Sequence, residues 1–82
     1  MIQIRIKLFA VVRDLAGKEN VTLTLPASST AGDAIDVLLE EYPSMKKWKP
    51  HLRVAVNCEY VSKNVSLHEN DEVALIPPVS GG

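Results

Sequence analysis

Ile2-Gln3-Ile4-Arg5-Ile6-Lys7-Leu8 alternates branched aliphatic side chains with polar ones. A period of two predicts a strand over residues 2–8 with one buried and one solvated face. Residues 72–76, Glu72-Val73-Ala74-Leu75-Ile76, form a second compact apolar run near the other end of the chain. A nearly all-apolar strand is typical of the centre of a sheet, so we expect these two strands to be neighbours.

The segments after the first strand predict a helical turn, a strand and the main helix. Residues 9–15 lose the alternation and precede Gly17, which suits a turn. Residues 21–25 alternate again up to Pro26, and this strand could pair antiparallel with the first. Thr30 and Asp33 predict a capping box for a helix over residues 31–42, which Pro43 stops.

The second half of the chain predicts only short elements. Residues 44–51 look irregular and basic, with Trp48 closing one end of the core. Residues 52–56 predict a third strand that ends at Asn57, a residue tolerant of the left-handed turn conformation. One or two short strands are expected, around residues 60–61 and 65–67. The order predicts an α+β roll of the β-grasp type, with a mixed sheet of about five strands covered by one main helix.

Length and composition limit the classes of function. The chain has 82 residues, 46% of them hydrophobic, and a formal net charge of −1. One small domain of this size leaves little room for a deep catalytic cleft, and the charge balance argues against nucleic acid as the main partner. The sequence has no apolar run long enough for a bilayer and no signal-peptide core, so a cytoplasmic location is expected and no membrane partner.

Two prolines and two glycines stand at the C-terminal end of the sequence, where they predict the end of the sheet and a narrow tail. Proline cannot donate a ladder hydrogen bond, so the sheet should end before Pro77-Pro78. Gly81-Gly82 has no side chains and could pass through a channel as narrow as the backbone. We therefore predict a folded domain over residues 1–78 and a tail over residues 79–82 that delivers the Gly82 carboxylate to another protein.

Three segments together resemble a known family. They are Phe9-Ala10-Val11-Val12-Arg13-Asp14-Leu15-Ala16-Gly17, Asp71-Glu72-Val73-Ala74 and Pro77-Pro78-Val79-Ser80-Gly81-Gly82. In this order they are similar to the small subunit of molybdopterin synthase, a ubiquitin-like sulfur carrier. Two positions depart from the family pattern: Asn70 stands where a glycine is usual, and Asn57-Cys58 replaces the common asparagine-glycine turn.

The resemblance implies a carrier that is not a catalyst by itself. A ubiquitin-activating-like adenylyltransferase would use ATP to convert the Gly82 carboxylate to an acyl-adenylate, and a persulfide sulfur would replace AMP to give a thiocarboxylate. The tail would then enter the large catalytic subunit, in a heterotetramer, and donate sulfur to cyclic pyranopterin monophosphate. No cofactor is expected to be bound. The implied partner contacts are Phe9, Arg13, Pro77, Pro78, Val79, Ser80 and Gly81.

Other readings stay open at this stage. The same tail could form an isopeptide bond with a target lysine, as ubiquitin does, or deliver sulfur for thiamine or transfer-RNA thiolation. A plain interaction module with an artificial terminus is a third possibility. Cys58 is interpreted as an incidental thiol, and the spacing of His51, Cys58 and His68 matches no metal-ligand pattern.

Overall fold

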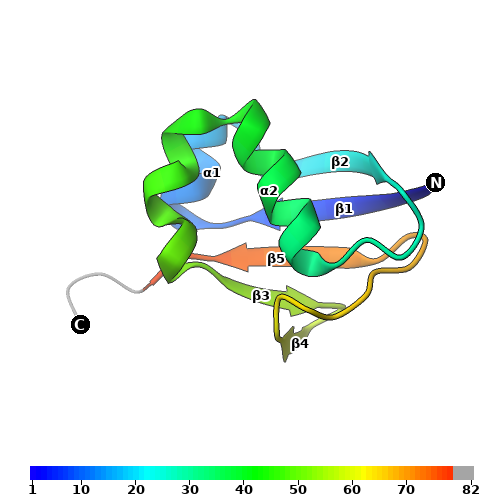
Figure 1. The fold of residues 1–82 in the computed structure, drawn as a ribbon. Coiled ribbons are helices and arrows are strands. Elements are labelled where there is room, and N and C mark those ends of the chain that lie inside the picture. The colour runs from blue at the N-terminus through cyan, green and yellow to red at the C-terminus, as the bar shows by residue number, and fades with distance from the viewer. Residues whose placement is uncertain (79–82) are drawn as a thin grey trace.

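The computed structural model describes residues 1–78, which form one mixed sheet with helices (Figure 1). Its strand order is β2-β1-β5-β3-β4. The elements in chain order are β1 (Ile2–Leu8), α1 (Ala10–Ala16), β2 (Asn20–Leu25), α2 (Ala31–Glu41), η1 (Pro43–His51), β3 (Arg53–Val56), β4 (Glu59–Val61) and β5 (Glu72–Ile76). This is the expected β-grasp roll. None of the helices in residues 1–78 is long and apolar enough to cross a membrane.

The two end strands are the central pair of the sheet, as their apolar content predicts. β1 and β5 run parallel, with Arg5 opposite Glu72 and Leu8 opposite Leu75, and the other pairings are antiparallel. Figure 1 shows the N-terminus at one end of the sheet and the end of β5 at the other. The parallel register therefore fixes the end of the molecule from which the C-terminal residues leave.

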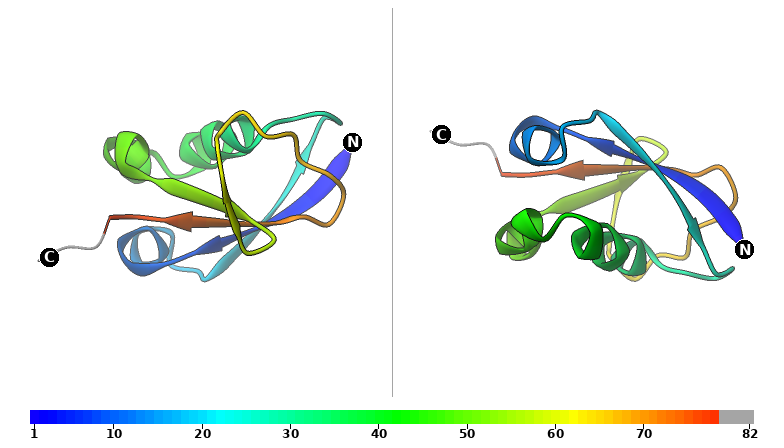
Figure 2. Two further views of the ribbon diagram at one scale, coloured as in Figure 1. Left: turned by 90° about the horizontal axis from the view of Figure 1, so that it is seen from below. Right: turned by 90° about the horizontal axis from the view of Figure 1, so that it is seen from above.

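One core lies between α2 and one face of the sheet. Ile4, Ile6 and Leu8 of β1 are almost fully buried, and Leu38 of α2 has no exposed surface. The two views of Figure 2 place α2 and η1 on one side of the sheet. In both views α1 lies on the other side of β5, at the end that leads to the C-terminus.

The capping box predicted at the start of α2 is present. The Asp33 amide donates to Thr30 Oγ1 at 3.1 Å, and the Thr30 amide donates to Asp33 Oδ2 at 2.9 Å. The Ala31 and Gly32 amides donate to the carbonyls of Val65 and Lys63. The free amides of the first helical turn thus have partners within the domain.

One prediction for the second half of the chain is wrong, and one that was left open is decided. Residues 44–51 are not irregular but belong to the 3-10 helix η1, in which the inward residues Met45 and Trp48 are three positions apart. This spacing matches the three residues per turn of a 3-10 helix. Within residues 1–78, β4 is the one short strand of the two that were considered. Residues 65–67 form no strand; Ser66 makes an isolated bridge with Thr30, flanked by bonds from the Ala31 amide to the Val65 carbonyl and from the Leu67 amide to the Ser29 carbonyl.

Loss of the cap should lower stability without changing the fold. Thr30→Ala removes the side-chain acceptor for the Asp33 amide and should lower the free energy of unfolding by about 1 kcal/mol. Thr30→Ser keeps the hydroxyl and should retain most of that stability. Urea denaturation of both variants checks this, and equal losses for alanine and serine would contradict the role of the cap.

Candidate functional site

The site begins where β5 ends. Ile76 is the last residue of β5 in register with β3, opposite Arg53. Pro77 is buried and belongs to the folded body, whereas Pro78 is exposed. Residues Val79, Ser80, Gly81 and Gly82 lie outside the described part of the chain, so their predicted roles stay predictions.

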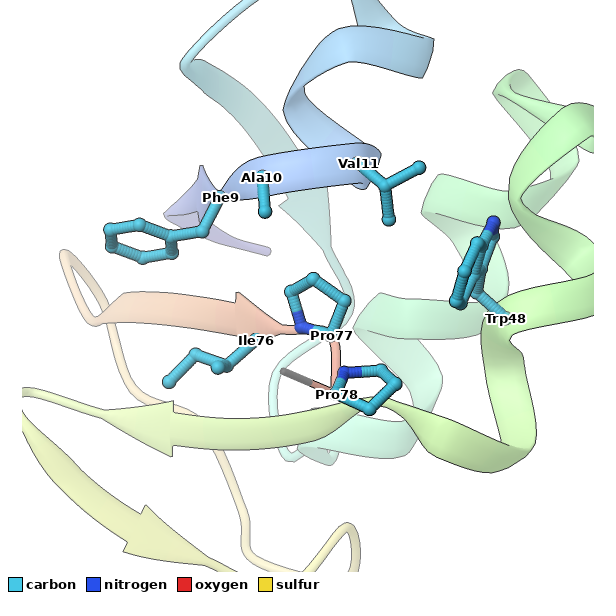
Figure 3. A pocket seen from close by; sticks show the side chains of 7 residues that line it. All are labelled: Phe9, Ala10, Val11, Trp48, Ile76, Pro77 and Pro78. Atoms are coloured by element: carbon cyan, nitrogen blue, oxygen red, sulfur yellow. The ribbon is translucent and has the colours of Figure 1, made fainter. Parts of the chain in front are cut away.

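A groove of about 610 Å³ surrounds this point, between α1 and η1 (Figure 3). We call it the tail-base groove; its lining residues are Phe9, Ala10, Val11, Trp48, Ile76, Pro77 and Pro78. Figure 3 shows Phe9 and Ile76 toward one end, Val11 and Trp48 toward the other, and the two prolines between them. All seven side chains are predominantly apolar, so the groove offers a surface for an apolar group.

Ala10, at the start of α1, has an unusual backbone. Its φ is +51°, in the left-handed region that costs a residue with a Cβ about 1–2 kcal/mol. The other non-glycine residues with positive φ in residues 1–78 lie outside the groove. This strained conformation turns the chain sharply from β1 into α1 and holds Phe9 and Val11 along one wall.

Trp48 has two roles, one of which sequence reasoning missed. It packs against the core, as predicted, but it also forms a wall of the groove. Its indole N–H is buried and has no hydrogen-bond partner in residues 1–78. No local signal could place Trp48 beside Pro77 and Pro78, because 29 residues lie between positions 48 and 78.

A second surface, with alanines at its centre and Lys7 and Glu72 also lining it, lies on the face of the sheet opposite α2. The register aligns Lys7, Ala74, Ala55 and Tyr60 in one row across four strands. The two alanines make a shallow floor, and Tyr60 and Phe9 stand at its sides with 66% and 39% of their surfaces exposed. We call this surface the outer face; Phe9 and Ile76 line both it and the groove.

The remaining residues considered from the sequence lie outside the tail-base groove, although Cys58 lines the outer face. Arg13 is exposed, forms a 3.9 Å contact with Asp14, and does not line the groove. Cys58 is exposed in the turn between β3 and β4, where Asn57 and Cys58 both have positive φ. Within residues 1–78, no three His, Cys, Asp or Glu side chains are placed to hold a metal ion.

A β-grasp domain with an exposed apolar surface around its C-terminal exit defines a ubiquitin-like protein. The chain belongs to the ThiS family, whose model matches residues 6–82. This match extends from β1 through the residues that follow the groove.

Curated relatives and solved structures resemble the whole chain. The molybdopterin synthase sulfur carrier subunit of Arabidopsis thaliana is 36% identical over 99% of this chain and 84% of its own length. The protein of the same name from Dictyostelium discoideum is 40% identical over 98% and 96%. The crystal structure of SAMP1 from Haloferax volcanii has a TM-score of 0.88 and 32% identity over 98% of this chain and 99% of that one.

The strain at Ala10 predicts opposite results for two glycine substitutions in α1. Ala10→Gly relieves the left-handed strain and should leave the free energy of unfolding unchanged or raise it by up to about 1 kcal/mol. Ala16→Gly, at a position without positive φ, should lower it by about 1 kcal/mol. Thermal and urea unfolding compare the two, and a larger loss for Ala10→Gly would show that its backbone is not strained.

Proposed function

We propose that this chain is the sulfur carrier subunit of a molybdopterin synthase and that the Gly82 carboxylate carries the sulfur. The observation that supports this most is the combination of full-length similarity to two carriers of that name with a groove built around the base of the tail. The position of the groove fits a protein whose C-terminal residues are handled by partners, because any partner that takes up the tail also meets the groove.

The chemistry starts by turning the carboxylate into an electrophile. A Gly82 carboxylate oxygen attacks the α-phosphorus of ATP on the activating enzyme, and pyrophosphate leaves. The terminal sulfur of a persulfide then attacks the acyl carbon and displaces AMP. The product is an acyl disulfide that joins Gly82 to the sulfur donor. A thiol then attacks the donor's sulfur, the S–S bond breaks, and the products are a new disulfide and the Gly82 thiocarboxylate. Sulfur transfer from Gly82 to cyclic pyranopterin monophosphate occurs on the large subunit, and two such transfers give the dithiolene.

This chain contributes presentation and recognition. Gly81 and Gly82 have no Cβ, so the tail fits a narrow channel that keeps water away from the acyl-adenylate. Pro77 anchors the base of the tail in the body, since it is buried beneath the groove. The outer face, with Phe9 and Tyr60 exposed, supplies the apolar contact with the large subunit.

A protein modifier is the second candidate. Its support is the similarity to the small archaeal modifier protein 1, which is 33% identical over 93% of this chain. The two functions share adenylation and differ in the acceptor, which is a lysine amine for a modifier. Mass spectrometry of tryptic peptides from cells decides between them, because a modifier leaves a remnant of this C-terminus on target lysines.

Intact-mass analysis tests the carrier function directly. Incubation with the cognate activating enzyme, ATP and a persulfide source should raise the mass by the difference between one sulfur and one oxygen atom. Deletion of Gly82 should abolish the shift, because the reacting carboxylate is then misplaced by a residue in the enzyme's channel. Absence of the shift in the native chain under these conditions would refute the proposal.

The outer face gives a prediction about the large subunit. Tyr60→Glu places a charge on the proposed contact and should weaken the complex with the cognate large subunit at least about tenfold. Val37→Glu is the matched control, since Val37 is an exposed apolar residue of α2 that lies away from this face. Calorimetric titration measures both. Equal affinities of the two variants for the large subunit would show that the outer face is not part of the interface.

A further inference from the structure

Charge is unevenly distributed along the chain. Residues 42–58 contain four of the nine lysines and arginines and none of the ten acidic residues. Most of this stretch is η1, and Lys46, Lys47 and Lys49 are all exposed. In a chain with a net charge of −1, such a run concentrates positive charge on and directly after η1.

The positive surface adjoins the tail-base groove. A 3-10 helix turns by about 120° per residue, so Lys47 and Lys49 leave η1 on opposite sides of Trp48. Lys49 reaches α2, where its Nζ lies 2.7 Å from Asp36 Oδ1. Lys46 and Lys47 form no ion pair with any group in residues 1–78. These two charges therefore remain available beside the Trp48 wall of the groove.

A further cation lies next to η1. Lys63 Nζ donates to the Lys49 carbonyl at 3.3 Å, close to the end of η1. Arg53, directly after η1, is exposed and opposite Ile76 in the sheet. Lys63 and Arg53 thus add to the positive charge at the end of η1.

We propose that the activating enzyme docks here through a segment with one apolar side chain flanked by carboxylates. The apolar side chain occupies the tail-base groove and the carboxylates face Lys46 and Lys47. This inference rests on the proposed function, which supplies the enzyme, and adds the chemistry by which it recognises the chain. The large subunit is assigned to the outer face, which leaves the Trp48 side of the groove and its lysines for the other partner of the tail. Opposite charges would raise the rate of that encounter.

Steady-state kinetics of ATP-dependent activation test the docking surface. With the cognate enzyme at low ionic strength, Lys47→Glu should raise the KM for this chain about fivefold to tenfold and leave kcat within about twofold. Lys18→Glu is the control of equal charge change, since Lys18 is exposed and lines neither the groove nor the outer face. Circular dichroism confirms that both variants fold.

A second pair of variants tests the groove itself. Val11→Glu places a carboxylate in the groove, where it would repel the carboxylates of the enzyme's segment, and should raise the KM for this chain. Val37→Glu, on α2 and outside the groove, should leave KM unchanged. The KM of the native chain should also rise with salt, and that of Lys47→Glu should rise less.

The outcomes separate this inference from the proposed function. If the native chain is activated but Lys47→Glu and Lys18→Glu have the same KM, the docking surface is wrong and the carrier function stands. A salt-independent KM for the native chain also overturns the docking surface. If the native chain is not activated at any concentration, both proposals fail.

Discussion

The parallel pairing of β1 with β5 is the constraint on which the rest of the structure depends. It joins residues 2–8 to residues 72–76 at the centre of the sheet, and its register sets Leu8 beside Leu75. Because the two strands run in the same direction, their C-terminal ends lie at the same end of the sheet. Phe9 and Pro77 follow these strands directly and therefore line the same groove, whose other walls come from α1 and η1.

Most of the fold could be predicted from the sequence because its signals are local. Alternation marked β1, β2 and β3, a compact apolar run marked β5, and the Thr30–Asp33 pair marked the start of α2. The 3-10 helix η1 was not predicted, since its apolar spacing of three residues involves only Met45 and Trp48 within a basic segment. Of the one or two short strands expected, β4 formed, whereas residues 65–67 instead bond to the segment that leads into α2, through the Val65 carbonyl and the Leu67 amide.

The site was predictable only in part, for a different reason. Phe9, Pro77 and Pro78 were named from family resemblance, and all three line one groove. Arg13, named on the same basis, does not line it. Trp48 and Tyr60 come from η1 and β4, and only the assembled sheet brings them near the exit or onto the outer face. The tail itself lies beyond the described residues, so its chemistry rests on similarity and on its glycines.

The central place of β5 has a consequence during protein synthesis. A growing chain that has not reached Glu72 lacks the middle strand, so β1–β2 and β3–β4 have no common neighbour and cannot form one sheet. Contacts that join the two ends of a chain form late and in an all-or-none manner. A translation product truncated before β5 thus lacks the central strand of the sheet and the groove residues Ile76, Pro77 and Pro78. The topology itself acts as a check on completeness.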